Sequence, residues 1–159
     1  AKNGGQITIS AWYKRDGNGT GIQPLVELYQ SGNERAYIYT HDSDGNGSHS
    51  IKVASVIDSS LQSNTAPNET LRNNSWHHIV WTISSTTINT YVDGGPVVSY
   101  DWALPITNLN DGFSISIAKE LSNTIYFSGK IDDVRLYSRA LSPDEVGDLY
   151  RLGHATISK

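Results

Sequence analysis

The stretch that decides the fold is FSGKIDDVRLYSRALS, residues 127–142. Its first part, 127–137, mixes apolar and polar residues in the alternation of a half-buried β-strand. The apolar positions change parity between Ile131 and Val134. We therefore expect the buried face of this strand to switch between them, at a bulge.

A helix start follows this strand directly. Ser142 and Glu145 have the spacing of a capping box, and the apolar residues flanking the cap supply a hydrophobic staple. Pro143 suits the first helical position, because its missing N–H would have no partner there anyway. These signals predict a short helix from 143 to about 151, which Gly153 ends in a left-handed conformation.

Upstream of residue 127, short segments rich in Ile, Val, Thr, Tyr and Trp recur between clusters of Gly, Asn, Asp and Ser. This spacing is typical of an antiparallel β-sandwich. The sequence between 93 and 95, Asp-Gly-Gly, predicts a tight hairpin turn. The polar stretch 58–74 reads as a long surface loop. Strands are expected near 6–14, 24–30, 35–41, 49–57, 75–84, 86–93, 96–102 and 113–118, in addition to 127–137.

Composition excludes several classes of function. The chain has 159 residues, 37% of them hydrophobic, and no Cys, so disulfides and thiolate chemistry are absent. A net charge of −4 with scattered basic residues argues against a nucleic-acid partner. Its apolar runs are far shorter than the ~20 residues that cross a bilayer, so membrane insertion is not expected. The chain opens on Ala1 without Met and is expected to be a piece of a larger protein.

Four separated strings now point to one family. They are ITISAW, WHHIV, YVDG and the stretch quoted above, at residues 7–12, 76–80, 91–94 and 127–142. In order and spacing they resemble the laminin-G-like, concanavalin A-like lectin/glucanase domains. The resemblance implies an all-β fold: a two-sheet antiparallel jelly-roll sandwich with one short C-terminal helix, formed by residues 1–159 as a single domain. Such domains are common in secreted and surface proteins of microbes, and many bind carbohydrate or calcium.

One departure from the family concerns the N-terminus. Related domains begin with a further strand, whereas here only Ala1 to Gln6 precede the first string. If that strand was cut away, a sheet edge stays open, and its unpaired backbone groups can recruit a strand from another protein. The C-terminal 155–158 segment folding back over the edge is the alternative.

Two rows of aromatic residues are candidate sugar platforms. Aromatic faces stack on sugar rings, while polar groups beside them bind the hydroxyls. The alternative for each row is that its rings only stabilise the sheet through cross-strand pairing. The candidate ligand-binding residues are Tyr37, Tyr39 and His41 in the first row, and Tyr100 and Trp102 in the second, with Asn110 and Asp111 in a loop behind it.

Two places are candidate calcium sites. The parity of Asp132 matches that of Val134, so its carboxylate is expected to point partly inward, and the family resemblance implies that it helps hold a structural calcium. Pairing with Arg or backbone N–H groups is the alternative. The loop after residue 41 resembles the start of an EF-hand, although its twelfth position is Val53 rather than Glu. A plain hairpin turn is the alternative there. Its candidate ligands are Asp42, Asp44 and Asn46.

Framework residues are expected to fill the core. Trp12, Trp76 and Trp81 belong to the family strings and are taken as core residues. His77 and His78 are adjacent in a strand and face opposite ways, so they cannot bind one metal ion together.

Catalysis is not expected. The family's glycosidases carry two facing carboxylates in a Glu-x-Asp-x-x-Glu string, which this sequence lacks. A Gly-x-Ser-x-Gly string is absent as well. The function expected is that of a non-catalytic, lectin-like carbohydrate-binding module of a secreted or cell-surface microbial protein. Its partner is a glycan or polysaccharide, with calcium as a structural cofactor. The alternative is a structural or assembly domain that makes protein contacts in an adhesin, a filament or a multidomain enzyme.

Overall fold

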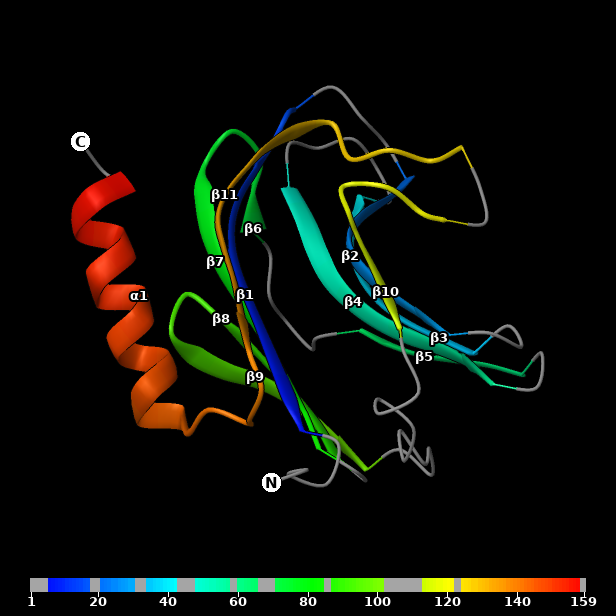
Figure 1. Ribbon diagram of the computed structural model, residues 1–159. Helices are drawn as coiled ribbons and strands as arrows, with labels where there is room; N and C mark the ends of the chain where they lie inside the picture. Colours follow the sequence, from blue (N-terminus) through cyan, green and yellow to red (C-terminus); the bar gives the residue numbers. More distant parts are fainter. Residues whose placement is uncertain are drawn as a thin grey trace. The chain divides into compact units, whose positions relative to one another are not determined.

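The computed structural model describes residues 6–17, 21–30, 34–42, 48–57, 60–65, 71–84, 87–101, 113–121 and 124–157. They form strands β1 to β11 and one helix, α1, as Figure 1 shows. The chain divides into two compact units. The first comprises Ala1–Lys14, Trp76–Asn110 and Ile131–Lys159, and the second comprises Arg15–Ser75 and Asp111–Lys130.

The first unit is built on a five-stranded sheet in the order β11-β1-β7-β8-β9. β1 pairs antiparallel with β7 from Ile7 opposite Ile83 to Lys14 opposite Trp76. Side chains alternate between the two faces of these strands. One face carries large buried residues such as Trp81, while the other carries Trp12 and Val80. The strands are β1 (Ile7–Arg15), β7 (Trp76–Ile83), β8 (Thr87–Val92), β9 (Gly95–Asp101) and β11 (Gly129–Tyr137).

The hairpin between β8 and β9 has the turn predicted from its sequence. Asp93 and Gly94 both have positive φ, 50° and 81°. Two successive positive φ values are typical of a type I′ turn, whose twist matches that of paired strands. Gly94 is needed for a second reason, because a Cβ there would lie 2.9 Å from the Tyr150 ring of the helix.

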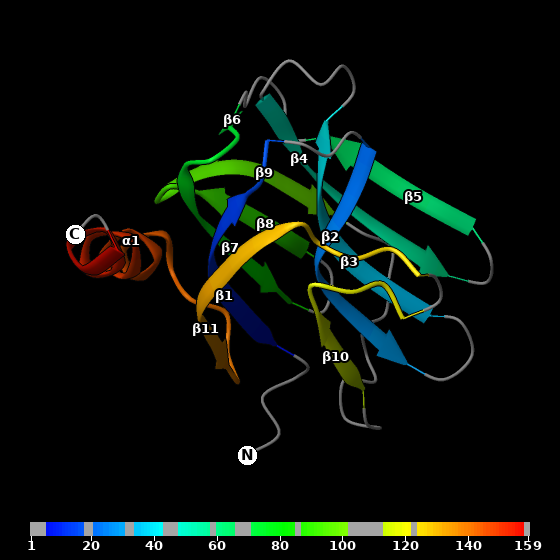
Figure 2. The same ribbon diagram turned by 90° about the horizontal axis from the view of Figure 1, so that it is seen from above.

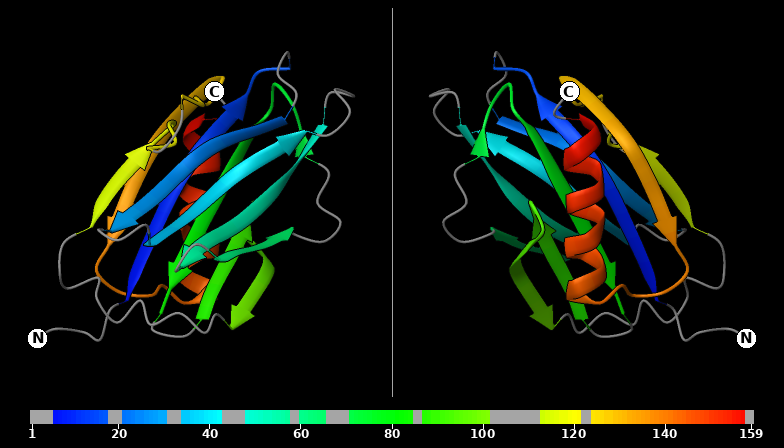
Figure 3. Two further views of the ribbon diagram at one scale, coloured as in Figure 1. Left: turned by 90° about the vertical axis from the view of Figure 1, so that its right-hand side faces the viewer. Right: turned by 90° about the vertical axis from the view of Figure 1, so that its left-hand side faces the viewer.

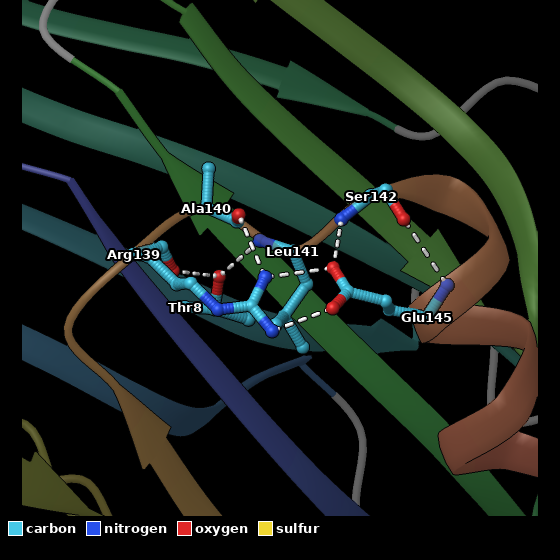
Figure 4. Close-up of polar contacts among 6 residues, drawn as sticks. All are labelled: Thr8, Arg139, Ala140, Leu141, Ser142 and Glu145. Atoms are coloured by element: carbon cyan, nitrogen blue, oxygen red, sulfur yellow. Dashed lines mark hydrogen bonds and ion pairs between the residues drawn. The ribbon is translucent and has the colours of Figure 1, made fainter.

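Helix α1 (Pro143–Ile157) begins with the predicted capping box, drawn in Figure 4. The Ser142 amide donates to Glu145 Oε2 at 2.8 Å, and the Glu145 amide donates to Ser142 Oγ at 3.3 Å. Arg139 holds both oxygens of the same carboxylate, at 2.7 and 2.5 Å. These Arg139 bonds and the Ser142 amide lower the pKa of Glu145 to about 2.

The segment that leads into the helix is anchored on β1. Thr8 Oγ1 donates to the Arg139 carbonyl at 2.7 Å and accepts from the Leu141 amide at 3.0 Å. Leu141 then packs with Val80, Tyr91 and Val146 in one buried cluster. This cluster fixes α1 along one face of the sheet, as the right-hand view of Figure 3 shows.

The helix is longer than predicted. It runs to Ile157 rather than ending near 151, and Gly153 lies inside it. Gly153 is buried against Trp12, and a Cβ there would overlap the indole ring. Glycine at this position therefore permits close helix–sheet packing instead of ending the helix. Within the described part of the chain, no helix combines the length and apolar character needed to cross a bilayer.

The second unit contains a sheet in the order β10-β2-β3-β4-β5, with β6 pairing β4 off this path. Figure 2 shows these strands lying side by side. The predicted surface loop 58–74 is wrong, because two strands lie inside it. The strands were not predicted because the mostly polar residues of this stretch show no apolar alternation. The strands are β2 (Gly21–Gln30), β3 (Glu34–Asp42), β4 (Ser48–Ile57), β5 (Ser60–Thr65), β6 (Leu71–Arg72) and β10 (Ser114–Ile117).

Strand β11 departs from expectation on one of two points. The predicted irregularity is present, since Asp133 has a φ of 48°. However, the residues expected to be buried are not: Val134 is 41% exposed and Leu136 is 56% exposed. The reason is that β11 ends the strand order, so it has a described strand only on its β1 side.

Candidate functional site

The first predicted aromatic row lies on one face of β3. Register places Tyr39 opposite Lys52 of β4, and His41 opposite Ser50. Directly opposite residues in an antiparallel pair share a face of the sheet. We call this face the tyrosine face and define it by the side chains of Tyr37, Tyr39, His41, Ser50 and Lys52.

The two tyrosine rings of this face form one contiguous surface. Their centroids are 5.5 Å apart and their planes are inclined by 35°. Tyr39 is buried at 6% exposure, and burial, with a smaller effect from Tyr37, raises the pKa of its hydroxyl. Tyr37 is only half-buried. The row therefore offers one partly open ring that is supported by a buried one.

The opposite face of the same strands is sealed. Ile38, Ile51 and Val53 are each exposed by 1% or less, and so is Thr40. The buried Arg15 donates to Thr40 Oγ1 at 2.7 Å on this side. The alternation predicted for β3 thus divides it into a buried face and the tyrosine face.

One end of the tyrosine face carries the positive charge of Lys52, next to His41. His41 and Lys52 are both half-buried. The pKa of His41 is lowered, first by burial, then by the charges of Lys52 and Arg15, against a smaller opposing effect of Asp42. His41 is therefore neutral at pH 7 and can both donate and accept a hydrogen bond.

The other end of the tyrosine face carries a buried carboxylate. Glu27 of β2 lies opposite Tyr37 in the register and is fully buried. Its Oε2 accepts a hydrogen bond from the Leu121 amide at 2.6 Å. The backbone near Leu121 therefore covers the face at Glu27, whereas Tyr37 and Lys52 keep part of their surface.

Most of the second predicted row cannot be placed. Tyr100 pairs with Ile88 through its backbone in β9. Its side chain lies outside the described part of the structure, and so do Trp102, Asn110 and Asp111. This second platform stays a prediction.

The predicted calcium ligands are not brought together among the described residues. The expectation that Asp132 points inward is wrong: it is exposed, and its Oδ1 accepts from the Asp133 amide at 2.7 Å. The neighbouring Asp133 and Arg135 form the exposed ion pair expected from their shared face, at 2.8 Å. Exposure of Asp132 follows from the same edge position that exposes Leu136.

Asp42 does lie inward, at 2% exposure. Its Oδ2 accepts from the side-chain Nδ2 of Asn73 at 3.3 Å, and Asn73 Oδ1 in turn accepts from His49 Nδ1 at 2.7 Å. Asp44 and Asn46 lie outside the described residues. Within the described residues, no three acidic or histidine side chains are grouped so as to hold a metal ion. The described residues alone do not supply the ligands of a calcium ion, and calcium at Asp132 or in this loop stays a prediction.

A buried histidine cluster beneath α1 was not predicted. His78 Nε2 and Ser10 Oγ are joined by a hydrogen bond of 2.9 Å, and the His78 ring contacts the stacked Trp12 and Tyr150 rings, with centroid distances of 5.0 and 6.1 Å. Burial lowers the pKa of His78 to about 4. The residues come from three separated segments, so their meeting leaves no local signal in the sequence.

This cluster lacks the geometry of a catalytic triad. Asp93 accepts from the ring of His77 at 2.8 Å and from the backbone amide of His78 at 2.8 Å, not from the His78 ring. A triad needs the carboxylate on the ring of the base. His77 and His78 thus face opposite ways, as predicted, and Asp93 ties their strand to the hairpin turn. Of the predicted core tryptophans, Trp12 and Trp81 are buried, whereas Trp76 is only half-buried.

Comparison with known proteins agrees with this architecture. The profile of the concanavalin A-like lectin/glucanases superfamily matches residues 1–147. The chain therefore belongs to this superfamily. A segment of the adhesion G-protein coupled receptor V1 of Danio rerio is 25% identical over 147 residues, which is 91% of this chain and 2% of the receptor. The chain thus spans only a small part of that relative's length.

Solved structures share the fold at low sequence identity. Domain 4 of an extracellular GH43 arabinanase from Geobacillus stearothermophilus, in complex with arabinotriose, has a TM-score of 0.70 at 20% identity, covering 92% of this chain and 66% of that one. The CBM40 of a Ruminococcus gnavus sialidase, bound to sialyllactose, has a TM-score of 0.67 at 18% identity, and the match covers 91% of this chain and 82% of that one. A pentraxin from Limulus polyphemus has a TM-score of 0.67 at 15% identity, and the match covers 91% of this chain and 69% of that one. The predicted all-β jelly-roll class with a C-terminal helix is confirmed.

Proposed function

We propose that the chain is a non-catalytic carbohydrate-binding module that binds glycans on the tyrosine face. The observation that supports this is the pairing of half-buried Tyr37 with buried Tyr39, flanked by Ser50, His41 and Lys52. A supported aromatic ring stacks on a sugar ring without first losing much side-chain entropy, and the flanking groups supply hydrogen bonds to hydroxyls. Several structurally similar domains are themselves carbohydrate-binding modules, which is consistent with this role.

The chemistry of the tyrosine face supports binding without catalysis. Glycoside hydrolysis needs two carboxylates on either side of the scissile bond. Glu27, which register places on this face, is buried and bonded to the Leu121 amide. A carboxylate held in this way is not positioned to act on a sugar.

We place this module outside the cell, as part of a longer secreted or surface protein. The receptor segment and the extracellular arabinanase domain that it resembles support this placement.

Structural calcium at Asp132 or at Asp42, Asp44 and Asn46 belongs to the same proposal. Chelation should then lower the melting temperature, and added calcium should restore it. An unchanged transition would exclude a structural calcium.

The test of glycan binding is a broad glycan array followed by calorimetry on the best ligand. Tyr37→Ala should lower affinity at least tenfold, which corresponds to about 1.4 kcal/mol. Tyr126→Ala is the matched control, because Tyr126 is a surface tyrosine of the same unit at 59% exposure. Trp102→Ala tests the second predicted platform in parallel. The proposal fails if no glycan binds, or if Tyr37→Ala and Tyr126→Ala have the same affinity.

A second candidate function, assembly with another protein, is favoured by strand β11. Among the described strands it ends its sheet, and it presents Val134 and Leu136 to solvent. An edge strand with exposed apolar residues is a template for pairing with another strand. Light scattering should then show association that increases with concentration. Leu136→Lys should abolish it, since a charge on an edge strand opposes pairing. A clean monomer at high concentration would rule this function out.

A further inference from the structure

The tyrosine face is electrically asymmetric along β3. Tyr37 lies opposite buried Glu27, and Tyr39 lies opposite Lys52 on the next strand. Successive residues on one face of a strand are about 7 Å apart. Tyr37 and Lys52 are therefore diagonal neighbours on this face, about 7–8 Å apart, a spacing comparable to the width of one sugar residue.

Among the side chains that the structure describes, none is a counter-ion of Lys52. It is half-buried, and its ammonium group forms no hydrogen bond or ion pair with any of the described residues. A partly desolvated cation without a partner is unfavourable by itself and becomes favourable when an anion binds. Arg15 adds positive potential from the other face of the sheet, since its charge acts on His41 in the same direction as that of Lys52.

We infer that the tyrosine face takes a sugar that carries a carboxylate, with its ring against Tyr37 and its carboxylate against Lys52. This inference rests on the proposed glycan-binding function and specifies its ligand. Ser50 and His41 lie next to Lys52: the His41 ring can donate to the same end of the sugar, and the Ser50 hydroxyl, which donates to the His41 carbonyl at 3.3 Å, can accept from it. Uronic acids and sialic acids both have this chemistry, a carboxylate on a pyranose ring.

The experiment compares each acid with a neutral partner of the same ring structure. Oligogalacturonides are titrated against their methyl esters, and sialyllactose is titrated against lactose, all by calorimetry at low salt. The free acid of at least one pair should bind about tenfold more tightly than its neutral partner. The pair that shows the difference identifies the source of the carboxylate. Raising the salt concentration should shrink the difference, because ions screen a partly exposed charge pair.

Variants of Lys52 assign the effect to the tyrosine face. Lys52→Gln should bring the acid to the affinity of the neutral sugar, and Lys52→Arg should keep most of the difference. Lys130→Gln makes the same change of charge at an exposed residue of the same unit and should leave the difference intact. Unchanged melting temperatures show that the variants are folded.

The outcomes separate this inference from the function on which it rests. Equal affinity for acid and neutral sugar, or an acid preference that survives in Lys52→Gln, overturns the inference alone. If neutral sugars bind and Tyr37→Ala abolishes their binding, the glycan-binding function stands without it. If neither acid nor neutral sugars bind, both fail.

Discussion

The two sheets carry similar rows of rings that differ in whether they are covered. In the first unit, Trp12 and His78 lie beneath α1 and are exposed by 2% and 1%. In the second unit, Tyr37 and His41 share one face of a single strand, β3, and stay half-buried. The alternation determines which side chains share a face, and the covering helix decides whether that face contributes to stability or is open to a ligand. Substitutions in the two rows should therefore affect different measurements.

The largest expected effect is that of Trp12→Ala. Removing this buried indole leaves a cavity beneath the helix and should lower the free energy of unfolding by about 3–5 kcal/mol. Tyr37→Ala should lower it by only about 1 kcal/mol, because its ring is partly exposed in the folded state. Urea denaturation followed by circular dichroism measures both. Similar losses of stability would show that the two rows do not differ in the way described.

The second largest effect is expected from acid, which should destabilise the folded chain through the buried His78 beneath α1. The pKa of His78 is lowered from 6.5 to about 4 by burial, partly opposed by Asp93 and Asp133 and slightly strengthened by Arg135. A lowered histidine pKa means that the unfolded chain binds more protons between these two values. The stability that comes from keeping His78 neutral is therefore fully present above pH 6.5. It is lost as the pH falls to about 4, by about 3 kcal/mol for this shift.

The contribution of His78 can be isolated by comparison with His78→Gln. The difference in unfolding free energy between the two proteins should shrink from pH 7 to pH 4, while titrations shared by both cancel. Glu145, whose pKa is lowered from 4.5 to about 2, begins to lose its stabilising contribution as the pH approaches 4.5, but it does so in both proteins and therefore cancels from this difference. A difference that is constant from pH 7 to pH 4 would show that His78 is not held neutral by burial.

The smallest expected effect distinguishes two glycines of α1. Gly153→Ala forces a methyl group against the Trp12 indole and should cost about 1–3 kcal/mol. At Gly147, a Cβ would meet only the flexible Arg151 side chain, at 3.3 Å. Gly147→Ala should therefore stabilise the chain by up to about 1 kcal/mol, through helix propensity. Thermal melting of both variants tests this, and shifts in the same direction would show that Gly153 does not pack against Trp12.

Local signals predicted the start of the helix and the β8–β9 turn, because each depends on residues within a few positions. Ser142 and Glu145 form the capping box, and Asp93 and Gly94 form the turn. The helix end was missed because Gly153 is kept by a contact with Trp12, more than a hundred residues away. β5 was missed because an edge strand can be held by backbone pairing with β4 without an apolar pattern of its own.

The candidate site was predicted in part for the same reason. Period-two alternation placed Tyr37, Tyr39 and His41 on one face. It could not show that Lys52 lies opposite Tyr39, because the register between strands depends on the whole hairpin. It also failed at Asp132, whose exposure depends on β11 ending its sheet.

The sequence by itself determined the class of fold, the cap of α1 and the residues that share each strand face, since steric and hydrogen-bonding preferences within a few residues are enough for these. Only the tertiary structure decided which faces are covered. Burial depends on segments that meet across long stretches of chain, as Gly153 meets Trp12 and Leu121 meets Glu27. That is why Trp12 is buried beneath α1, whereas Tyr37 keeps part of its surface exposed.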